Sequence, residues 1–80
     1  MYTDAMKMAF HSIRAPKNFS LQIIDNDHFL TVKATEKDFM SLNLDEKYLA
    51  VEYMIRVKKA LEDNGAIVLL VREGGKEDGI

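Results

Sequence analysis

Six consecutive apolar residues, Ala66 to Val71, follow Asn64-Gly65 and constrain the fold more than any other feature of the chain. A β-strand with one face in water alternates polar and apolar side chains, whereas a strand covered on both faces does not. The run therefore predicts a strand that is buried on both faces. A chain of 80 residues makes one domain with a small core. The second face of this strand must therefore be covered by another segment of the chain or by a second copy of it.

The pattern of residues 19–34 predicts a β-hairpin with Asp25-Asn26-Asp27-His28 at its centre. Asn26-Asp27 would form a two-residue type I′ loop, and Ile23 would then face Leu30 across the hairpin. This register separates the side chains into two faces. One face is wholly apolar and carries Phe19, Leu21, Ile23, Leu30, Val32 and Ala34. The other face is mostly polar, with Ile24 and Phe29 at the turn end.

Two helices are expected on either side of the hairpin. The first spans residues 4–14, with Asp4 as its N-cap and Pro16 as its end signal. The main helix spans residues 45–63 and ends at Asn64-Gly65. Its start is either Asp45 or a capping box formed by Asn43 and Glu46. A single helical turn is plausible within the connector of residues 35–43.

The main helix is apolar over a wider arc than one sheet face requires. Its core stripe consists of Ala50, Tyr53, Met54, Val57 and Leu61, and a second stripe beside it consists of Tyr48, Val51 and Ile55 with Leu44. One row of the last strand adds further apolar side chains. An uncovered apolar patch typically marks an interface. The candidate interface residues are Tyr48, Val51, Ile55, Ile24 and Phe29, and the alternative is that residues 39–44 cover this surplus.

The predicted fold class is α+β, a small single domain with the order α-β-β-α-β. A three-stranded sheet contains the hairpin (19–34), and one long helix packs on it. The last strand should run parallel to the second because a single helix joins them, in strand order 2-1-3 or 1-2-3. The domain spans residues 1–73, and residues 74–80 are expected to form a flexible C-terminal tail.

No motif for catalysis or cofactor binding is present. Gly74-Gly75 follows the last strand with no helix after it, so it is not a phosphate-binding loop. Asp25, Asp27 and His28 could be metal ligands, but the side chains of a tight hairpin point to alternating faces and make a poor metal cage. We therefore expect no catalytic residue, no metal and no cofactor, and the protein is not predicted to be an enzyme.

Basic residues form two clusters although the net charge is −2. The first cluster is Lys7, His11, Arg14 and Lys17, and the second includes Arg56 and Lys59. These residues are the candidates for an alternative function, a small nucleic-acid-binding protein that uses basic helical faces. Nucleic-acid binders are usually basic overall, so nucleic acid is an unlikely partner for this acidic chain.

Cysteine is absent, and the N-terminus lacks the features of a signal peptide, so a cytoplasmic location is expected. The six-residue apolar run is too short to span a bilayer, so no membrane partner is expected. The sequence favours a small non-enzymatic interaction protein that binds another macromolecule. Its expected partners are a second copy of itself, in a homodimer, and an unidentified protein.

Overall fold

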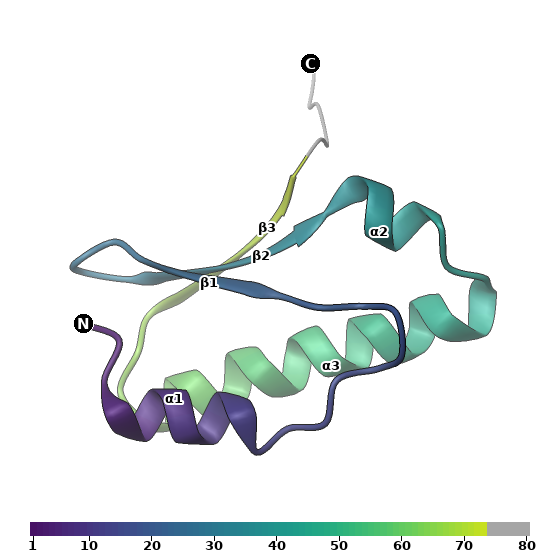
Figure 1. Cartoon of the computed structure of the whole chain (residues 1–80). Coiled ribbons are helices and arrows are strands. Elements are labelled where there is room, and N and C mark those ends of the chain that lie inside the picture. The colour runs from purple at the N-terminus through teal and green to yellow at the C-terminus, as the bar shows by residue number, and fades with distance from the viewer. Residues whose placement is uncertain (74–80) are drawn as a thin grey trace.

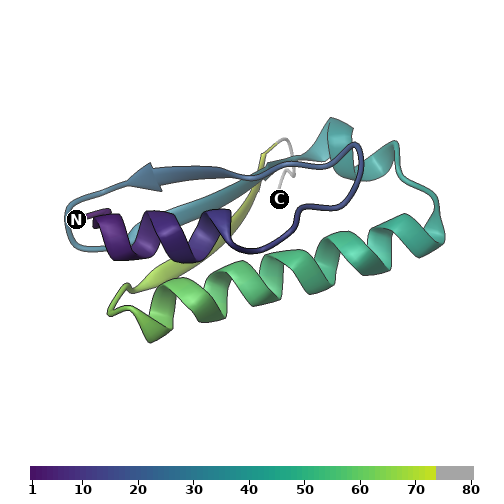
Figure 2. The ribbon, with the colours of Figure 1, turned by 60° about the horizontal axis from the view of Figure 1, so that its bottom comes forward.

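Three strands form one sheet, and the two longer helices lie against one of its faces (Figures 1 and 2). The computed structural model describes residues 1–73, apart from the side chains of residues 36, 37, 72 and 73, and the tail predicted for residues 74–80 lies outside the described residues. The elements are α1 (Asp4–His11), β1 (Gln22–Asp25), β2 (Leu30–Thr35), α2 (Glu36–Met40), α3 (Leu44–Asp63) and β3 (Val68–Glu73). This arrangement confirms the predicted α+β class and the order α-β-β-α-β.

The strand order is β1-β2-β3, one of the two orders that the sequence left open. β1 pairs with β2 in the antiparallel direction, and β3 pairs with β2 in the parallel direction, as a single crossover helix requires. Leu30 lies beside Val68, and Val32 lies beside Leu70. The central strand β2 therefore joins the local hairpin to the distant C-terminal strand.

The hairpin register differs by two residues from the predicted one. Ile23 lies opposite Val32, not Leu30, and Asp25 lies opposite Leu30. The reason is that the turn residues are Asp27-His28: the Asn26 N–H donates to the Phe29 carbonyl at 2.9 Å, and the His28 N–H donates to the Asn26 carbonyl at 2.7 Å. A two-residue shift leaves every side chain on its predicted face. The apolar face of the hairpin is therefore unchanged.

Side chains of the turn hold this register. The Asn26 amide donates to the Thr31 hydroxyl at 2.7 Å, across the two strands. The Asp25 carboxylate accepts from the Asp27 N–H at 3.1 Å. Asp27 is at the centre of a three-residue turn with a φ of 68°, a backbone conformation that is strained for a residue with a Cβ.

Replacing Asp27 with glycine should leave the free energy of unfolding unchanged or raise it by about 0.5 kcal/mol, because glycine adopts positive φ without strain. Asn26→Gly is the matched control, since it removes the bond to Thr31 and should cost about 1 kcal/mol. Urea denaturation followed by circular dichroism measures both. A loss above about 0.5 kcal/mol for Asp27→Gly would mean that the turn differs from this description.

The start of α1 differs from the prediction, and the start of α3 is one of the two that the sequence left open. The N-cap of α1 is Thr3, whose hydroxyl accepts from the Met6 N–H at 3.2 Å, so the prediction of Asp4 as N-cap is wrong. Asp4 is instead in the first turn, where a carboxylate favours the helix dipole. α1 also ends earlier than predicted, at His11. For α3 the capping box is present, with Asn43 and Glu46 each accepting a backbone N–H of the other.

The end of α3 and the connector agree with the sequence. α3 ends at Asp63, and Gly65 adopts a φ of 96°, which a side chain would strain. The helical turn considered for the connector is α2, and the Thr35 hydroxyl accepts from the Asp38 N–H at its start. Both segments are therefore placed by local signals.

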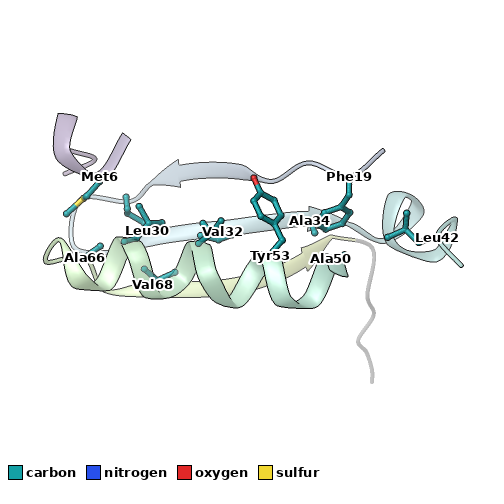
Figure 3. Packing of buried hydrophobic residues seen from close by; sticks show 12 residues of the cluster. Met6, Phe19, Leu30, Val32, Ala34, Leu42, Ala50, Tyr53, Ala66 and Val68 are labelled. Atoms are coloured by element: carbon teal, nitrogen blue, oxygen red, sulfur yellow. The ribbon is translucent and has the colours of Figure 1, made fainter. Parts of the chain in front are cut away.

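The core lies between the sheet and the two longer helices (Figure 3). Tyr53 of α3 contacts Phe19 edge to face, with 6.3 Å between ring centroids. The full set of buried residues is Met6, Phe19, Leu30, Val32, Ala34, Leu42, Ala50, Tyr53, Val57, Leu61, Ala66 and Val68. The Cα trace measures 33 × 30 × 14 Å, so the domain is a thin plate of two layers.

Within the single chain β3 is covered on one face only, so of the two sources predicted for the second cover the chain itself does not supply it. Val68 points into the core and is 6% exposed, whereas Ile67, Leu69 and Val71 are 66%, 49% and 42% exposed. The physical reason is that α1 and α3 lie on the same side of the sheet (Figure 2). Within residues 1–73 no element covers the other side.

Asp25 connects the N-terminus to the hairpin turn. Its carboxylate accepts hydrogen bonds from the N-terminal ammonium of Met1 and, at 2.9 Å, from the Tyr2 N–H. The bond from the ammonium, followed by the bond from Tyr2, holds the pKa of the Asp25 carboxyl below its ordinary value. Charge and hydrogen bonding therefore place the start of α1 against the end of β1.

The lowered pKa of Asp25 predicts a pH dependence of stability. A depressed folded-state pKa stabilises the fold fully above about pH 5, where the unfolded-state carboxyl is also ionised, and this stabilisation is lost as the pH falls through the lowered pKa. Asp25→Asn should therefore be less stable than the wild type at pH 7, and the difference should shrink as the pH falls through the lowered pKa. Urea unfolding across this range measures it. Asp27→Asn is the control, and an equal pH response in both variants would contradict the assignment.

Candidate functional site

The outer face of the sheet carries a group of apolar side chains, here called the sheet-face patch, on either side of Thr31 and Lys33 of the central strand. Ile24 lies beside Thr31, which lies beside Leu69, so one row of side chains crosses all three strands. The patch consists of Ile24, Phe29, Ile67, Leu69 and Val71; the first two are half-buried and the last three are exposed. It contains two of the predicted interface residues, Ile24 and Phe29. The sequence left open which row of β3 would join them.

A second apolar group, the helix stripe, lies on α3. Its members are Leu44, Tyr48, Val51 and Ile55, which are 67%, 66%, 39% and 56% exposed. The buried residues of α3, among them Ala50 and Val57, lie on the opposite side of the helix. The helix stripe therefore faces away from the sheet. The five predicted interface residues are divided between two opposite surfaces of the plate.

The connector covers neither surface. Leu42 is buried in the core, and Phe39 lines a hollow of about 320 Å³ together with Ala34, Met54, Leu70 and Val71. Ala34 is a core residue, so Phe39 packs at the helix side of the sheet. Residues 39–44 therefore do not cover the sheet-face patch or the helix stripe, which was the alternative that the sequence left open.

The segment between α1 and β1 passes along α3 (Figure 2). Residues of the segment and of the helix line a cleft. Its volume is about 360 Å³. One wall is formed by Arg14, Ala15, Pro16 and Lys17, and the other by Leu49, Glu52, Tyr53 and Arg56. The cleft, here called the basic cleft, thus brings together Arg14, Lys17 and Arg56, which belong to two separate clusters in the sequence.

The other three nucleic-acid candidates lie outside the basic cleft. Lys7 lies over the Tyr2 ring, with its Nζ 5.6 Å from the centroid, and His11 contacts the Phe10 ring at 5.1 Å. Lys59 forms an exposed ion pair with Asp63 at 3.6 Å. The six basic candidates therefore do not converge on one surface.

The tyrosine of the basic cleft keeps its proton over a wide pH range. Tyr53 is 6% exposed, and burial raises the pKa of its hydroxyl. Its ring projects from α3 beside Phe19 (Figure 3). The hydroxyl has no hydrogen-bond partner within residues 1–73. It can therefore donate a hydrogen bond to a ligand or to water.

The described residues offer no metal centre. Residues 1–73 contain no group of three or more histidine, cysteine, aspartate or glutamate side chains placed to share a metal ion. Asp25, one member of the group considered in the hairpin, binds the N-terminal ammonium instead.

Across the part of the chain that the structure describes, none of the helices combines the length and the apolar character that crossing a bilayer demands.

The chain matches no protein-family model, no curated protein and no solved structure. The features of the chain that bear on its function are therefore the two apolar surfaces and the basic cleft.

Proposed function

We propose that this protein is a small non-enzymatic interaction protein, which forms a homodimer through the sheet-face patch and binds another protein through the helix stripe. The observation that carries the proposal is the uncovered outer face of the parallel pair β2–β3. The strands of all-parallel sheets are covered on both faces and carry near-continuous apolar runs, and residues 66–71 form such a run in this mixed sheet. The exposed row Ile67, Leu69 and Val71 is wholly apolar, as it is in strands that are covered on both faces.

The outer face of the sheet is broad enough for a second copy. The plate measures 33 × 30 Å across its broad dimensions, so each copy has room for the roughly 800 Å² that a standard interface buries per partner. A two-fold axis would place the same patch on both sides, and two sheets pack face to face at about 10 Å. The result would be four layers, helix, sheet, sheet and helix. A core of this small size gains stability from such an association.

The helix stripe would remain on the outside of this dimer. Its residues follow one another at intervals of four, three and four positions, a spacing that keeps all four on one side of an α-helix. We therefore propose that the partner of the helix stripe is an amphipathic helix of another protein. Two such stripes per dimer would allow bivalent binding.

The alternative function, nucleic-acid binding, draws its support from Arg14, Lys17 and Arg56 in the basic cleft. We rank it second because the remaining basic candidates lie elsewhere and the chain carries a net charge of −2. The absence of cysteine supports a cytoplasmic location for the proposed dimer.

The deciding experiment is sedimentation equilibrium of the full chain at micromolar concentrations. The proposal expects a mass of twice 9.2 kDa. A chain that stays monomeric at about 100 μM would contradict it, since standard-size interfaces hold at that concentration. Salt titration of any complex with generic DNA or RNA tests the alternative, because phosphate contacts weaken steeply with salt. A micromolar complex at physiological salt would put the alternative first.

A further inference from the structure

Three cationic residues line the basic cleft, two on one wall and one on the other. Arg14 and Lys17 come from the segment after α1, and Arg56 comes from the middle of α3. None of the three forms an ion pair within residues 1–73. Glu52 stands one turn before Arg56, yet the two side chains are not paired. Three unpaired cations and one carboxylate in the same cleft favour the binding of an anion.

The charge and the polar groups of the cleft indicate which anion. Three cations and the single carboxylate of Glu52 leave an excess of two positive charges. A phosphate monoester carries between −1.5 and −2 at pH 7, whereas a carboxylate carries −1. Guanidinium groups bind phosphate oxygens through paired hydrogen bonds, and the unpartnered Tyr53 hydroxyl adds a donor.

The volume and the apolar walls indicate what else the ligand carries. A cleft of about 360 Å³ is within the range of small-molecule sites, and it exceeds what a bare phosphate would fill. Leu49, Ala15 and Pro16 supply an apolar surface next to the charges. We propose that the basic cleft binds a small-molecule phosphate monoester that bears an apolar or aromatic group. This site is separate from both apolar surfaces and does not depend on the dimer.

The test is a titration of the ¹⁵N-labelled chain with phenyl phosphate, followed by amide chemical shifts. Saturable shifts should be confined to residues 14–17 and 49–56, which form the walls of the cleft. Benzenesulfonate, which has the same ring and one negative charge, should bind at least about fivefold more weakly at pH 7.5. Absence of saturation at about 10 mM phenyl phosphate, or shifts spread evenly over all basic residues, would overturn the proposal.

Variants separate the cleft from general electrostatic attraction. Arg14→Gln and Arg56→Gln should each weaken phenyl phosphate binding about tenfold, because each removes a charge-assisted hydrogen bond. Lys59→Gln is the matched control, one turn from Arg56 on the same helix and outside the cleft. Tyr53→Phe should weaken binding by a smaller factor of about three. Equal effects of Lys59→Gln and Arg56→Gln would overturn the assignment to the cleft.

The pH and the source of the phosphate provide two further comparisons. The charged or titratable groups around the ligand are Arg14, Lys17, Arg56, Glu52 and Tyr53, with no histidine. The second pKa of a phosphate monoester is about 6, so the preference over benzenesulfonate should decline between pH 7.5 and pH 5.5. A preference that does not change with pH would contradict a dianion site.

A phosphotyrosine peptide should bind no more tightly than phenyl phosphate, and a tenfold tighter peptide would overturn the small-molecule assignment.

Discussion

Leu61→Ala is expected to lower the free energy of unfolding by about 3 kcal/mol, the largest stability effect of the substitutions considered. Leu61 has no exposed surface and lies in the last turn of α3, within the main core cluster. Truncation removes buried apolar contacts and leaves a cavity that the neighbouring strands and helices fill only in part. Because a domain of this size has only about 5 kcal/mol of stability, the variant should lose most of it.

Urea denaturation measures this loss as a lower midpoint with an unchanged slope, and a thermal scan should show a midpoint lower by roughly 15 °C. Leu44→Ala is the matched control, since the same truncation on a side chain that is 67% exposed should change stability by less than about 0.5 kcal/mol. Similar losses for both variants would mean that Leu61 is not packed as described.

Leu69→Glu is expected to convert the proposed dimer into monomers at micromolar concentration. Leu69 lies in the sheet-face patch beside Thr31 and is 49% exposed in the single chain. In the dimer a glutamate there would be buried without a partner, and the two-fold axis would repeat the cost in the second copy. An uncompensated buried charge costs about 3–5 kcal/mol, so the dissociation constant should rise by at least about a thousandfold.

The matched control is Ile55→Glu, the same introduced charge in the helix stripe on the opposite side of the plate. Sedimentation should give twice the chain mass for Ile55→Glu and the single mass for Leu69→Glu. The reverse result would move the self-interface to the helix stripe. Circular dichroism of both variants should match the wild type, because each altered side chain is exposed in the monomer.

Local signals in the sequence were sufficient for the elements but not for their exact pairing. The capping box at Asn43 and the glycine at Gly65 mark the ends of α3, and both are present in the structure. Alternation in the hairpin predicted its apolar face correctly. It could not decide the register, because turns at Asn26-Asp27 and Asp27-His28 place the same residues on the same face. The bonds of Asp25 and Asn26 decide between them.

The surfaces were predictable only in part, because they depend on how distant segments meet. Tyr48, Val51 and Ile55 share one side of α3 by helical periodicity alone. The basic cleft, in contrast, requires the segment after α1 to pass along the middle of α3, and no local pattern encodes that contact. For β3, the composition indicated two covered faces without indicating that both helices would lie on the same one.

The parallel pairing of β3 with β2 also determines the order in which this chain can fold. β1 and β2 are joined by a tight turn and can pair within microseconds, whereas β3 reaches β2 only after α2 and α3 have been made. During synthesis, Leu30 and Val32 therefore lack the neighbour strand on one side until β3 has left the ribosome. An edge that stays open this long is a target for association with other unfinished chains. The pairing of β3 with β2 thus covers this open edge and removes the target.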